Sequence, residues 1–238
     1  MKLDILAFAA HPDDIELAAC GTLMAHLALG KKVGIIDITR GELGTRGSAE
    51  LRDKEAALSS EILGIHVREN LGLRDGFFVK DESSIYRVIE MLRKYQPEIV
   101  IANSETDRHI DHGRAADLVH DACFLSGLIK IQTTHNGTAQ EAWRPKQVYH
   151  YIQDYYTKPD VIVDITPFYH RKIKAIEAFS SQFYDPNSIE PDTPISGKDF
   201  WDFLEGRARQ FGRLVNVTYG EGFTVKRPIG CTNLLELL

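Results

Sequence analysis

Short apolar runs alternate with segments of helical periodicity through the first half of the chain. We predict buried strands at the apolar runs, residues 3–9, 32–39, 67–71 and 98–102. Between and after them, apolar positions recur at helical spacing, which predicts helices over 16–29, 48–63, 83–95 and about 111–126. This alternation indicates parallel strands joined by right-handed crossovers, with helices on both faces of the sheet.

The ends of the predicted helices carry recognisable signals. Ser48 can cap the helix that follows it, and Gly30 and Gly64 are typical of the residue after a helix C-terminus. Pro97 ends the helix before it. The usual sheet for this pattern is the doubly wound, Rossmann-like order 3-2-1-4, in which the chain reverses direction between the first and fourth strands.

The second half of the chain is predicted to extend the same sheet. Strands are expected at 147–152 and 161–165, and helices from residue 168 to about 180 and from about 200 to 214. A loop rich in proline, aspartate and serine, 185–198, separates the helices, and a short tail follows them. Because no stretch has the composition of a linker, we expect a single α/β domain over residues 1–238.

The composition is that of a globular protein, with 43% hydrophobic and 26% charged residues. The net charge of −6 argues against binding to nucleic acid or an anionic membrane, since both normally require a basic face. No apolar run approaches the roughly 18 residues of a membrane span. Residues 1–10 lead directly into a strand pattern, without the basic and apolar regions of a secretory signal.

Cysteine usage points to a reducing compartment. Cys20, Cys123 and Cys231 form an odd and widely spaced set, which fits reduced thiols in the cytoplasm better than a disulfide framework. Cys20 and Cys123 lie in apolar helical patterns, so we expect them in the core.

The two densest clusters of histidine and aspartate follow the first and fourth predicted strands. They are His11-Pro12-Asp13-Asp14 and Asp107-Arg108-His109-Ile110-Asp111-His112. Open α/β sheets bind ligands beyond the carboxyl ends of their strands, in the crevice where the strand order reverses. The predicted topology therefore brings both clusters to the same crevice.

The spacing within the clusters suits a divalent metal. His11 and Asp14, with one histidine from the second cluster, would supply two imidazoles and one carboxylate. Such a set serves zinc hydrolysis as well as Fe²⁺ oxygen chemistry, and zinc is favoured because spare carboxylates and a spare histidine remain to move protons. The alternative is that Asp13 and Asp14 only cap the helix that begins near Ile15.

The residues that are not ligands can carry out acid–base chemistry. Asp13, next to a ligand but itself free, is suited to accept a proton from water that attacks a carbonyl group. The histidine that is not a ligand can stabilise the oxyanion or protonate the leaving amine, and Asp111 can orient that histidine.

The loop after the second strand, residues 40–47, combines glycines with charged side chains. Charged residues in and after this loop can form a wall for a polar, anionic ligand, since arginine suits carboxylates. They are Arg40, Glu42, Arg46 and Arg52. The alternative is a solvated surface loop. Asp75, after the third strand, can contact sugar hydroxyls or form an ordinary turn with Gly76.

Several enzyme classes lack their motifs here. The first strand is not followed by Gly-x-Gly-x-x-Gly, and the chain has no phosphate loop, no His-Glu-x-x-His and no Gly-x-Ser-x-Gly. A dinucleotide-binding fold of the usual kind and a serine hydrolase are therefore disfavoured.

Residues 10–14, Ala-His-Pro-Asp-Asp, and 109–112, His-Ile-Asp-His, resemble the LmbE/PIG-L family of metal-dependent N-acetylglucosamine deacetylases. The resemblance spans nearly the whole chain. Segments 40–47, 70–78 and 181–187 are similar to one branch in particular, which deacetylates N-acetylglucosaminyl malate, giving glucosaminyl malate and acetate, in bacillithiol biosynthesis.

The resemblance implies a role for each residue of the two clusters. The zinc ligands would be His11, Asp14 and His112. Asp13 would be the general base, and His109, supported by Asp111, would stabilise the tetrahedral intermediate.

The resemblance also implies contacts with the substrate and with other subunits. Arg52 and Asp75 match sugar-contacting positions, and Arg108 is placed to meet the malate carboxylates. Asp107 stands where some relatives have a tyrosine. Relatives commonly form homo-oligomers, several of them hexamers, so a homo-oligomer is expected.

Two rival functions stay open. One is a deacetylase of free N-acetylglucosamine, a chitooligosaccharide or another amide. The other is a non-catalytic metal- or nucleotide-binding α/β module. The free side chains of Asp13 and His109 argue against the module, because a structural or storage site needs no unbound acid–base pair.

Overall fold

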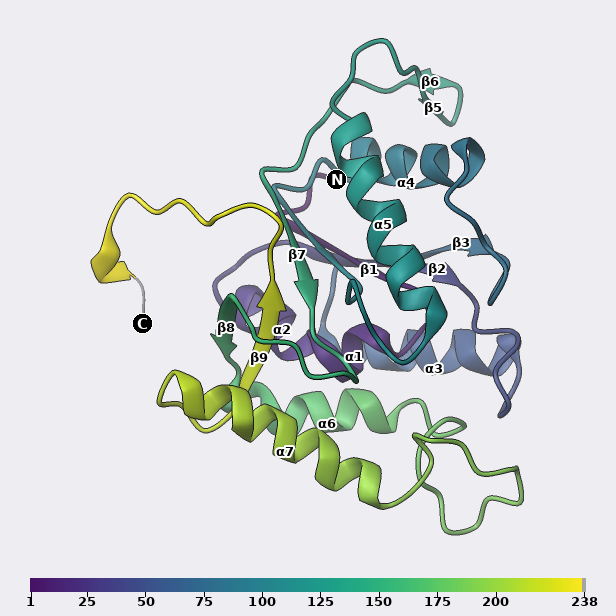
Figure 1. Ribbon diagram of the computed structural model, residues 1–238. Coiled ribbons are helices and arrows are strands. Elements are labelled where there is room, and N and C mark those ends of the chain that lie inside the picture. The colour runs from purple at the N-terminus through teal and green to yellow at the C-terminus, as the bar shows by residue number, and fades with distance from the viewer. Residues whose placement is uncertain (237–238) are drawn as a thin grey trace.

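The computed structural model describes residues 1–236 and contains a seven-stranded sheet between two layers of helices (Figure 1). The strands of this sheet are β1 (Ile5–Ala9), β2 (Val33–Thr39), β3 (Val67–Leu73), β4 (Ile99–Ala102), β7 (Gln147–Tyr151), β8 (Val161–Asp164) and β9 (Gly220–Thr224). The helices are α1 (Asp14–Ala18), α2 (Cys20–Ala28), α3 (Ala49–Leu63), α4 (Glu82–Tyr95), α5 (Ile110–Leu125), α6 (Tyr169–Glu177) and α7 (Asp199–Leu214). A small hairpin, β5 (Thr134–His135) and β6 (Thr138–Ala139), and two 3₁₀ turns, Thr166–Phe168 and Leu234–Glu236, complete the described elements.

The strand order is β3-β2-β1-β4-β7-β9-β8. The strands from β3 to β7 run parallel, whereas β9 is antiparallel to both of its neighbours, β7 and β8. The predicted Rossmann-like order with its reversal between β1 and β4 is therefore confirmed. The carboxyl ends of β1 and β4 meet at the same edge of the sheet, which is where the two clusters were expected.

Helices cover both faces of the sheet, as predicted (Figure 1). Side chains of β1 alternate between the two faces because successive residues of a strand point in opposite directions. Leu6 and Phe8 belong to the core beneath α4 and α5. Ile5 and Ala7 belong to the core that includes residues of α1, α2, α3 and α6. The chain thus buries this strand completely and fixes the loop that leaves it.

The capping predictions for α3 are confirmed. The Ser48 side chain accepts a hydrogen bond from the backbone N–H of Leu51 at 3.2 Å. Gly64 ends the helix with φ of 73°, a left-handed conformation that glycine adopts at little cost. Helix α3 therefore begins and ends where its sequence signals place it.

The predicted helix over 16–29 is wrong in one respect, because it is divided into α1 and α2 at Ala19, where φ is −140°. The division frees backbone N–H groups at the start of α2. Those of Gly21 and Thr22 donate to the carboxylate of Glu221 at 3.0 and 2.7 Å. Glu221 is buried and pairs with Lys172 at 2.6 Å. A residue from the far end of the chain thus stabilises the break.

Strand β9 lies where the sequence predicted only a tail. Its residues, Gly-Glu-Gly-Phe-Thr, include glycine and glutamate, which are uncommon in strands. Helix α7 packs so closely against it that a Cβ atom at Gly222 would lie 3.0 Å from the Phe211 ring. Glycine at this position allows the helix to approach the strand.

The side chains of Cys20 and Cys123 are buried, as predicted, and Cys231 is exposed. All three thiols are free. Within residues 1–236, no helix is both long enough and apolar enough to cross a membrane.

Candidate metal centre and active site

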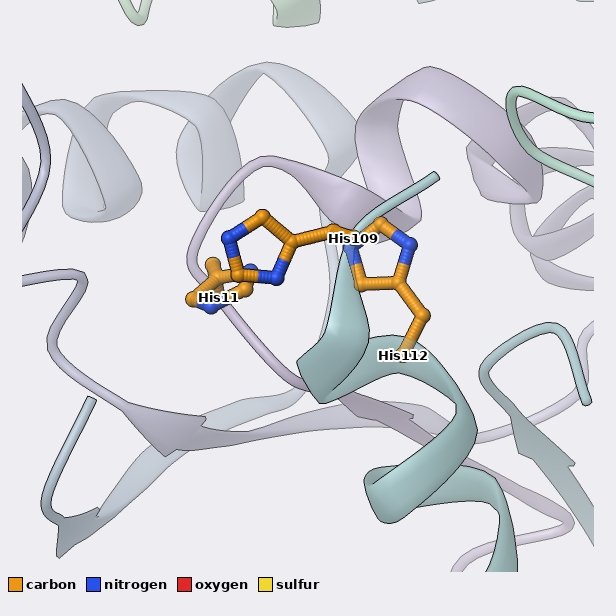
Figure 2. Close-up of side chains that lie close together, drawn as sticks. All are labelled: His11, His109 and His112. Atoms are coloured by element: carbon orange, nitrogen blue, oxygen red, sulfur yellow. The ribbon is translucent and has the colours of Figure 1, made fainter. Parts of the chain in front are cut away.

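The loop after β1 and the segment before and within the first turn of α5 meet at the carboxyl edge of the sheet. Figure 2 shows the rings of His11, His109 and His112 gathered at this point. The ring centroids of His11 and His109 are 4.5 Å apart, and those of His109 and His112 are 5.3 Å apart. The two clusters that the sequence separates by almost a hundred residues therefore form one site.

Asp14 lies between two of these histidines. Its Oδ1 atom is 3.2 Å from Nε2 of His112, and its Oδ2 atom is 3.7 Å from Nδ1 of His11. The Asp14 side chain is only 2% exposed. One nitrogen of each imidazole thus faces the carboxylate of Asp14, and these three groups are the predicted metal ligands.

The opposite nitrogen of each imidazole contacts another carboxylate. Nδ1 of His112 lies 2.7 Å from Asp107, while Nε2 of His11 lies 3.1 Å from Asp75 and 3.3 Å from Asp111. A carboxylate behind a metal-binding histidine is the common arrangement, because it fixes the tautomer and the orientation of the ring. These contacts leave Nδ1 of His11 and Nε2 of His112 facing Asp14.

Asp14 itself is held by three donors. The Asn103 side-chain amide donates to Oδ2 at 3.1 Å, the Gln153 amide to Oδ1 at 2.8 Å, and the His11 backbone N–H to Oδ2 at 3.0 Å. Asn103 follows β4 and Gln153 follows β7, so the sheet edge itself fixes this carboxylate. The orientation of Asp14 is therefore set by groups of the protein itself.

The electrostatics of the site suit a cation. Burial opposes a charged His11, yet contacts with Asp111, Asp75 and Asp14 outweigh it and raise the pKa of His11 to about 10. At His112, burial is again outweighed, here by Asp14 and Asp107, and the pKa rises to about 9. The same histidines hold the pKa of Asp14 well below its usual range, although burial opposes the shift. The carboxylates attract positive charge, and the donor set of imidazoles and carboxylates fits a divalent transition metal.

Among residues 1–236, two groups at this site have ligand atoms that all lie within 4.8 Å of one another, and neither includes Asp14. One is His11, His109 and His112, and the other is His11, Asp75 and Asp111. Both share His11 with the predicted set of His11, Asp14 and His112. Nδ1 of His109 accepts the backbone N–H of Asp111, which leaves its Nε2 as the possible ligand atom, and the carboxylates of Asp75 and Asp111 accept backbone N–H groups as Asp14 does.

Asp13 has an unusual backbone, with φ of 125°. Its side chain makes no capping hydrogen bond to α1, so for this residue the helix-cap alternative fails. Instead, Oδ2 of Asp13 accepts a hydrogen bond from Nη1 of Arg52 at 3.3 Å. Burial raises the pKa of Asp13 to about 7, against the opposing charge of Arg52. A strained backbone at a buried, unligated carboxylate is typical of a functional residue.

His109 is placed as a hydrogen-bond donor toward the pocket. Its Nδ1 atom accepts the backbone N–H of Asp111 at 3.3 Å, so a neutral ring carries its proton on Nε2. Burial, together with the charges of His11 and His112, lowers the pKa of His109 and favours this neutral form. The expectation that the Asp111 carboxylate orients His109 is corrected, because that carboxylate contacts His11 and the backbone of Gly76.

The site opens into a pocket lined by three of the four residues predicted to contact substrate: Arg52, Asp75 and Arg108. Glu42 is not part of this lining in the described chain. Its carboxylate accepts the backbone N–H of Asp75 at 2.8 Å, so it holds the loop that carries Asp75. Through this bond Glu42 positions the pocket wall, and its direct contact with substrate stays a prediction.

The arginines of the 40–47 loop also do not form the predicted wall. Arg46 is buried and donates to the backbone carbonyl of Pro191 at 2.7 Å, which ties this loop to the segment before α7. Arg40 forms surface ion pairs with Glu50 and Asp53. Charge in this loop is used for structure, and the arginines that face the pocket come from other elements.

Sequence reasoning did not identify several residues of the site: Asn103, Gln153, Asp154 and Arg207. It placed Asp107 in the second cluster but gave it no role, and Asp107 contacts His112. Asn103 directly follows β4 and Gln153 lies two residues after the end of β7, so the rule that ligands bind at the carboxyl ends of strands could have indicated them. Arg207 lies on α7, and no local signal connects it with the site.

A doubly wound sheet with imidazoles and carboxylates gathered at its carboxyl edge, beside a free buried carboxylate, is the arrangement expected of a metal-dependent hydrolase. Comparison with known proteins agrees with this class. The model of the PIG-L family, described as GlcNAc-PI de-N-acetylase, matches residues 6–123. The chain belongs to the PIG-L family, whose members include N-deacetylases.

Solved structures extend the likeness over the whole chain. A conserved protein of Thermus thermophilus is 33% identical, with a TM-score of 0.86 and 98% of both chains covered. The N,N′-diacetylchitobiose deacetylase of Pyrococcus horikoshii is 27% identical, with a TM-score of 0.78, and the match covers 93% of this chain and 82% of the deacetylase. A 4-oxalmesaconate hydratase of Pseudomonas putida is 25% identical over 193 residues, which are 74% of this chain and 73% of the hydratase.

Proposed function

We propose that this enzyme hydrolyses the acetamide of N-acetylglucosaminyl malate with zinc, giving glucosaminyl malate and acetate in bacillithiol biosynthesis. The observation that carries the hydrolytic part is Asp13, a buried carboxylate beside the metal-binding cluster that takes no part in it. The malate part is supported by segments 40–47, 70–78 and 181–187 and by the arginines that line the pocket.

His11, Asp14 and His112 are the proposed ligands. Nδ1 of His11 and Nε2 of His112 both face Asp14, and their opposite nitrogens are engaged by carboxylates. When bound there, zinc would act as a Lewis acid and lower the pKa of water to about 7. Fe²⁺ or another divalent metal fits the same donor types, and metal analysis of the purified enzyme distinguishes them.

The remaining residues move protons and stabilise charge. Asp13 accepts the proton of the water that attacks the acetamide carbonyl, and the same carboxyl group then gives it to the leaving amine. Nε2–H of His109 donates to the oxygen that becomes negative in the tetrahedral intermediate. Arg52 donates to both Asp13 and the carbonyl of Pro12, at 3.3 and 2.9 Å, so it holds the base in place.

Substrate contacts follow from the lining of the pocket. Arg52 and Asp75 face the sugar in this proposal, and Arg108 lies at the side where an aglycone would extend. Asp75 also contacts His11 at 3.1 Å, so a sugar hydroxyl bound to it would lie next to the metal site.

The rival substrates are distinguished by acetate release. Purified enzyme is given N-acetylglucosaminyl malate, free N-acetylglucosamine or N,N′-diacetylchitobiose, each with and without a chelator. The proposal expects the highest kcat/KM on the malate conjugate and loss of activity with chelator. Preference for diacetylchitobiose, the substrate that the Pyrococcus relative's name gives, would replace malate with a chitooligosaccharide. No acetate from any amide would favour the non-catalytic module or a hydratase like the Pseudomonas relative.

A homo-oligomer, with a hexamer as the candidate size, and a cytoplasmic location complete the proposal. The compartment is supported by three free and widely spaced cysteines. Light scattering coupled to size-exclusion chromatography gives the number of subunits directly.

A further inference from the structure

Three arginines line the active-site pocket, and only one of them lacks an acidic partner. Arg52 lies 3.3 Å from Asp13, and Arg108 forms an ion pair with Asp154. Arg207, on α7, has no carboxylate within ion-pair distance among residues 1–236. A guanidinium group carries five N–H donors, so most of those on Arg207 remain open to a ligand.

The contacts of Arg207 hold its side chain without neutralising it. Nη2 donates to the backbone carbonyl of Leu17 at 2.6 Å, and the guanidinium carbon lies 5.3 Å from the centre of the Phe203 ring. Burial lowers the pKa of Arg207 to about 10. The group therefore remains charged at neutral pH, in surroundings where an anion would stabilise it.

Three carboxylates interact electrostatically with Arg207, and each of them contacts another residue directly. Glu221 pairs with Lys172 at 2.6 Å, and Asp154 pairs with Arg108. Asp107 contacts His112 at 2.7 Å. These acidic groups offset the charge of Arg207 only from a distance, so the cation is left without a direct counter-charge.

Arg207 also lies between two cavities. Besides the active-site pocket, it lines a smaller neighbouring cavity together with Tyr156 and Phe211, and Asp154 and Phe203 are common to both. A substrate with its acetamide at the metal centre and its aglycone directed toward α7 would bring that aglycone to Arg207.

We propose that Arg207 binds a carboxylate of the substrate's aglycone where the two cavities meet, and that this contact makes the enzyme selective for acidic conjugates. The inference rests on the proposed deacetylase function and names a specificity residue for it. Arg108 is the weaker candidate because Asp154 already neutralises it. A charge-assisted hydrogen bond of about 1.5–3 kcal/mol corresponds to roughly a ten- to hundredfold change in affinity.

The test compares two substrates that differ in charge, N-acetylglucosaminyl malate and methyl N-acetylglucosaminide. Arg207→Gln should lower kcat/KM for the malate conjugate by about ten- to a hundredfold, mainly through KM, and change the neutral glycoside less than about threefold. Arg207→Lys keeps the positive charge but loses the planar set of N–H donors. Its kcat/KM for the malate conjugate should therefore lie between those of the wild type and Arg207→Gln. Arg209→Gln is the matched control, because Arg209 lies on the same helix, is exposed and pairs with Glu205.

A second measurement keeps the two proposals separate. The inhibition constants of glucosaminyl malate and methyl glucosaminide are measured against hydrolysis of the neutral glycoside. Arg207→Gln should raise the constant of the acidic product about ten- to a hundredfold and leave the neutral one unchanged. If the wild type binds the acidic product through Arg207 but does not deacetylate the malate conjugate, the proposed function fails and the role of Arg207 stands.

Equal losses on both substrates, with normal metal content and thermal stability, would instead assign Arg207 a structural role through its bond to Leu17. The proposal would also be overturned if Arg207→Gln changed neither the kcat/KM for the malate conjugate nor the inhibition constant of glucosaminyl malate.

Discussion

Nδ1 of His112 lies 2.7 Å from Oδ2 of Asp107, which leaves Nε2 of the same ring to face Asp14. Asp107 is itself fixed by backbone N–H groups of Arg108, Asp154 and Tyr155 at 2.8 to 3.4 Å. Asp107 therefore supports a histidine of the proposed metal-binding cluster.

Asp107→Asn should weaken metal binding by about ten- to a hundredfold, because an amide is a poorer partner for the imidazole than a carboxylate. Metal affinity is measured by competition with a chromophoric chelator. Asp117→Asn, at an exposed acidic residue on α5, is the control and should leave affinity unchanged. Equal affinity in wild type and Asp107→Asn would show that the contact does not orient His112.

Replacing His11, Asp14 or His112 by alanine should abolish stoichiometric metal binding, since each change removes one of three proposed ligands. Metal content per chain is measured by elemental analysis. A chelator should lower the Tm of the wild type, because metal that binds the folded state stabilises it. It should leave the Tm of the three variants unchanged. Full metal content in all three variants would contradict the ligand assignment, and retention in Asp14→Ala alone would favour the three-histidine group.

Asp13→Asn should retain the metal and lose about 10²–10⁴-fold in kcat, because only proton transfer is removed. Asparagine is a better test than alanine at this residue. The backbone φ of Asp13 is 125°, which residues other than glycine rarely adopt, and asparagine tolerates positive φ better than alanine does. Near wild-type turnover in a metal-loaded Asp13→Asn enzyme would require another general base.

His150 should make the fold sensitive to acid. It is buried, its Nδ1 atom contacts the carbonyl of Asn103 at 2.9 Å, and burial lowers its pKa below the value of about 6.5 found in an unfolded chain. The neutral form therefore stabilises the folded state fully above pH of about 6.5, and this contribution is lost as the pH falls toward the folded pKa.

His150→Asn, which keeps a donor for Asn103, should reduce the loss of unfolding free energy between pH 7.5 and 5.5. Urea denaturation at both values measures it. The exposed His170, replaced in the same way, is the control and should leave the loss unchanged. An identical pH dependence in wild type and His150→Asn would mean that His150 is not the acid-sensitive group.

The fold could be predicted as far as local signals reach. Apolar periodicity placed the strands and helices of the first half, and the strand order then brought His11 and His112 together. The break at Ala19 has no local signal, because it depends on Glu221 from β9. Strand β9 was missed for a related reason: its glycines suit the close approach of α7, which only the folded structure reveals.

The candidate site shows the same limit. The residues of the two clusters are recognisable because they are dense in one segment each. Asp111 was paired with the wrong histidine because sequence proximity to His109 does not determine which ring its carboxylate reaches. Asp107 and Arg207 depend on contacts with distant segments, so their roles emerge from the three-dimensional arrangement.

Glu221 lies 200 residues after Gly21, to which it bonds, and this separation affects the timing of assembly. Strand β9 lies between β7 and β8 in the sheet, and its Glu221 stabilises the start of α2, which follows the metal-binding loop and α1. During synthesis, every proposed metal ligand leaves the ribosome long before this strand does. A nascent chain that ends after α7 therefore contains the ligands without the strand that completes the sheet. Contacts between such distant parts of a chain slow folding, so the finished site is expected only after β9 has been synthesised and has joined the sheet.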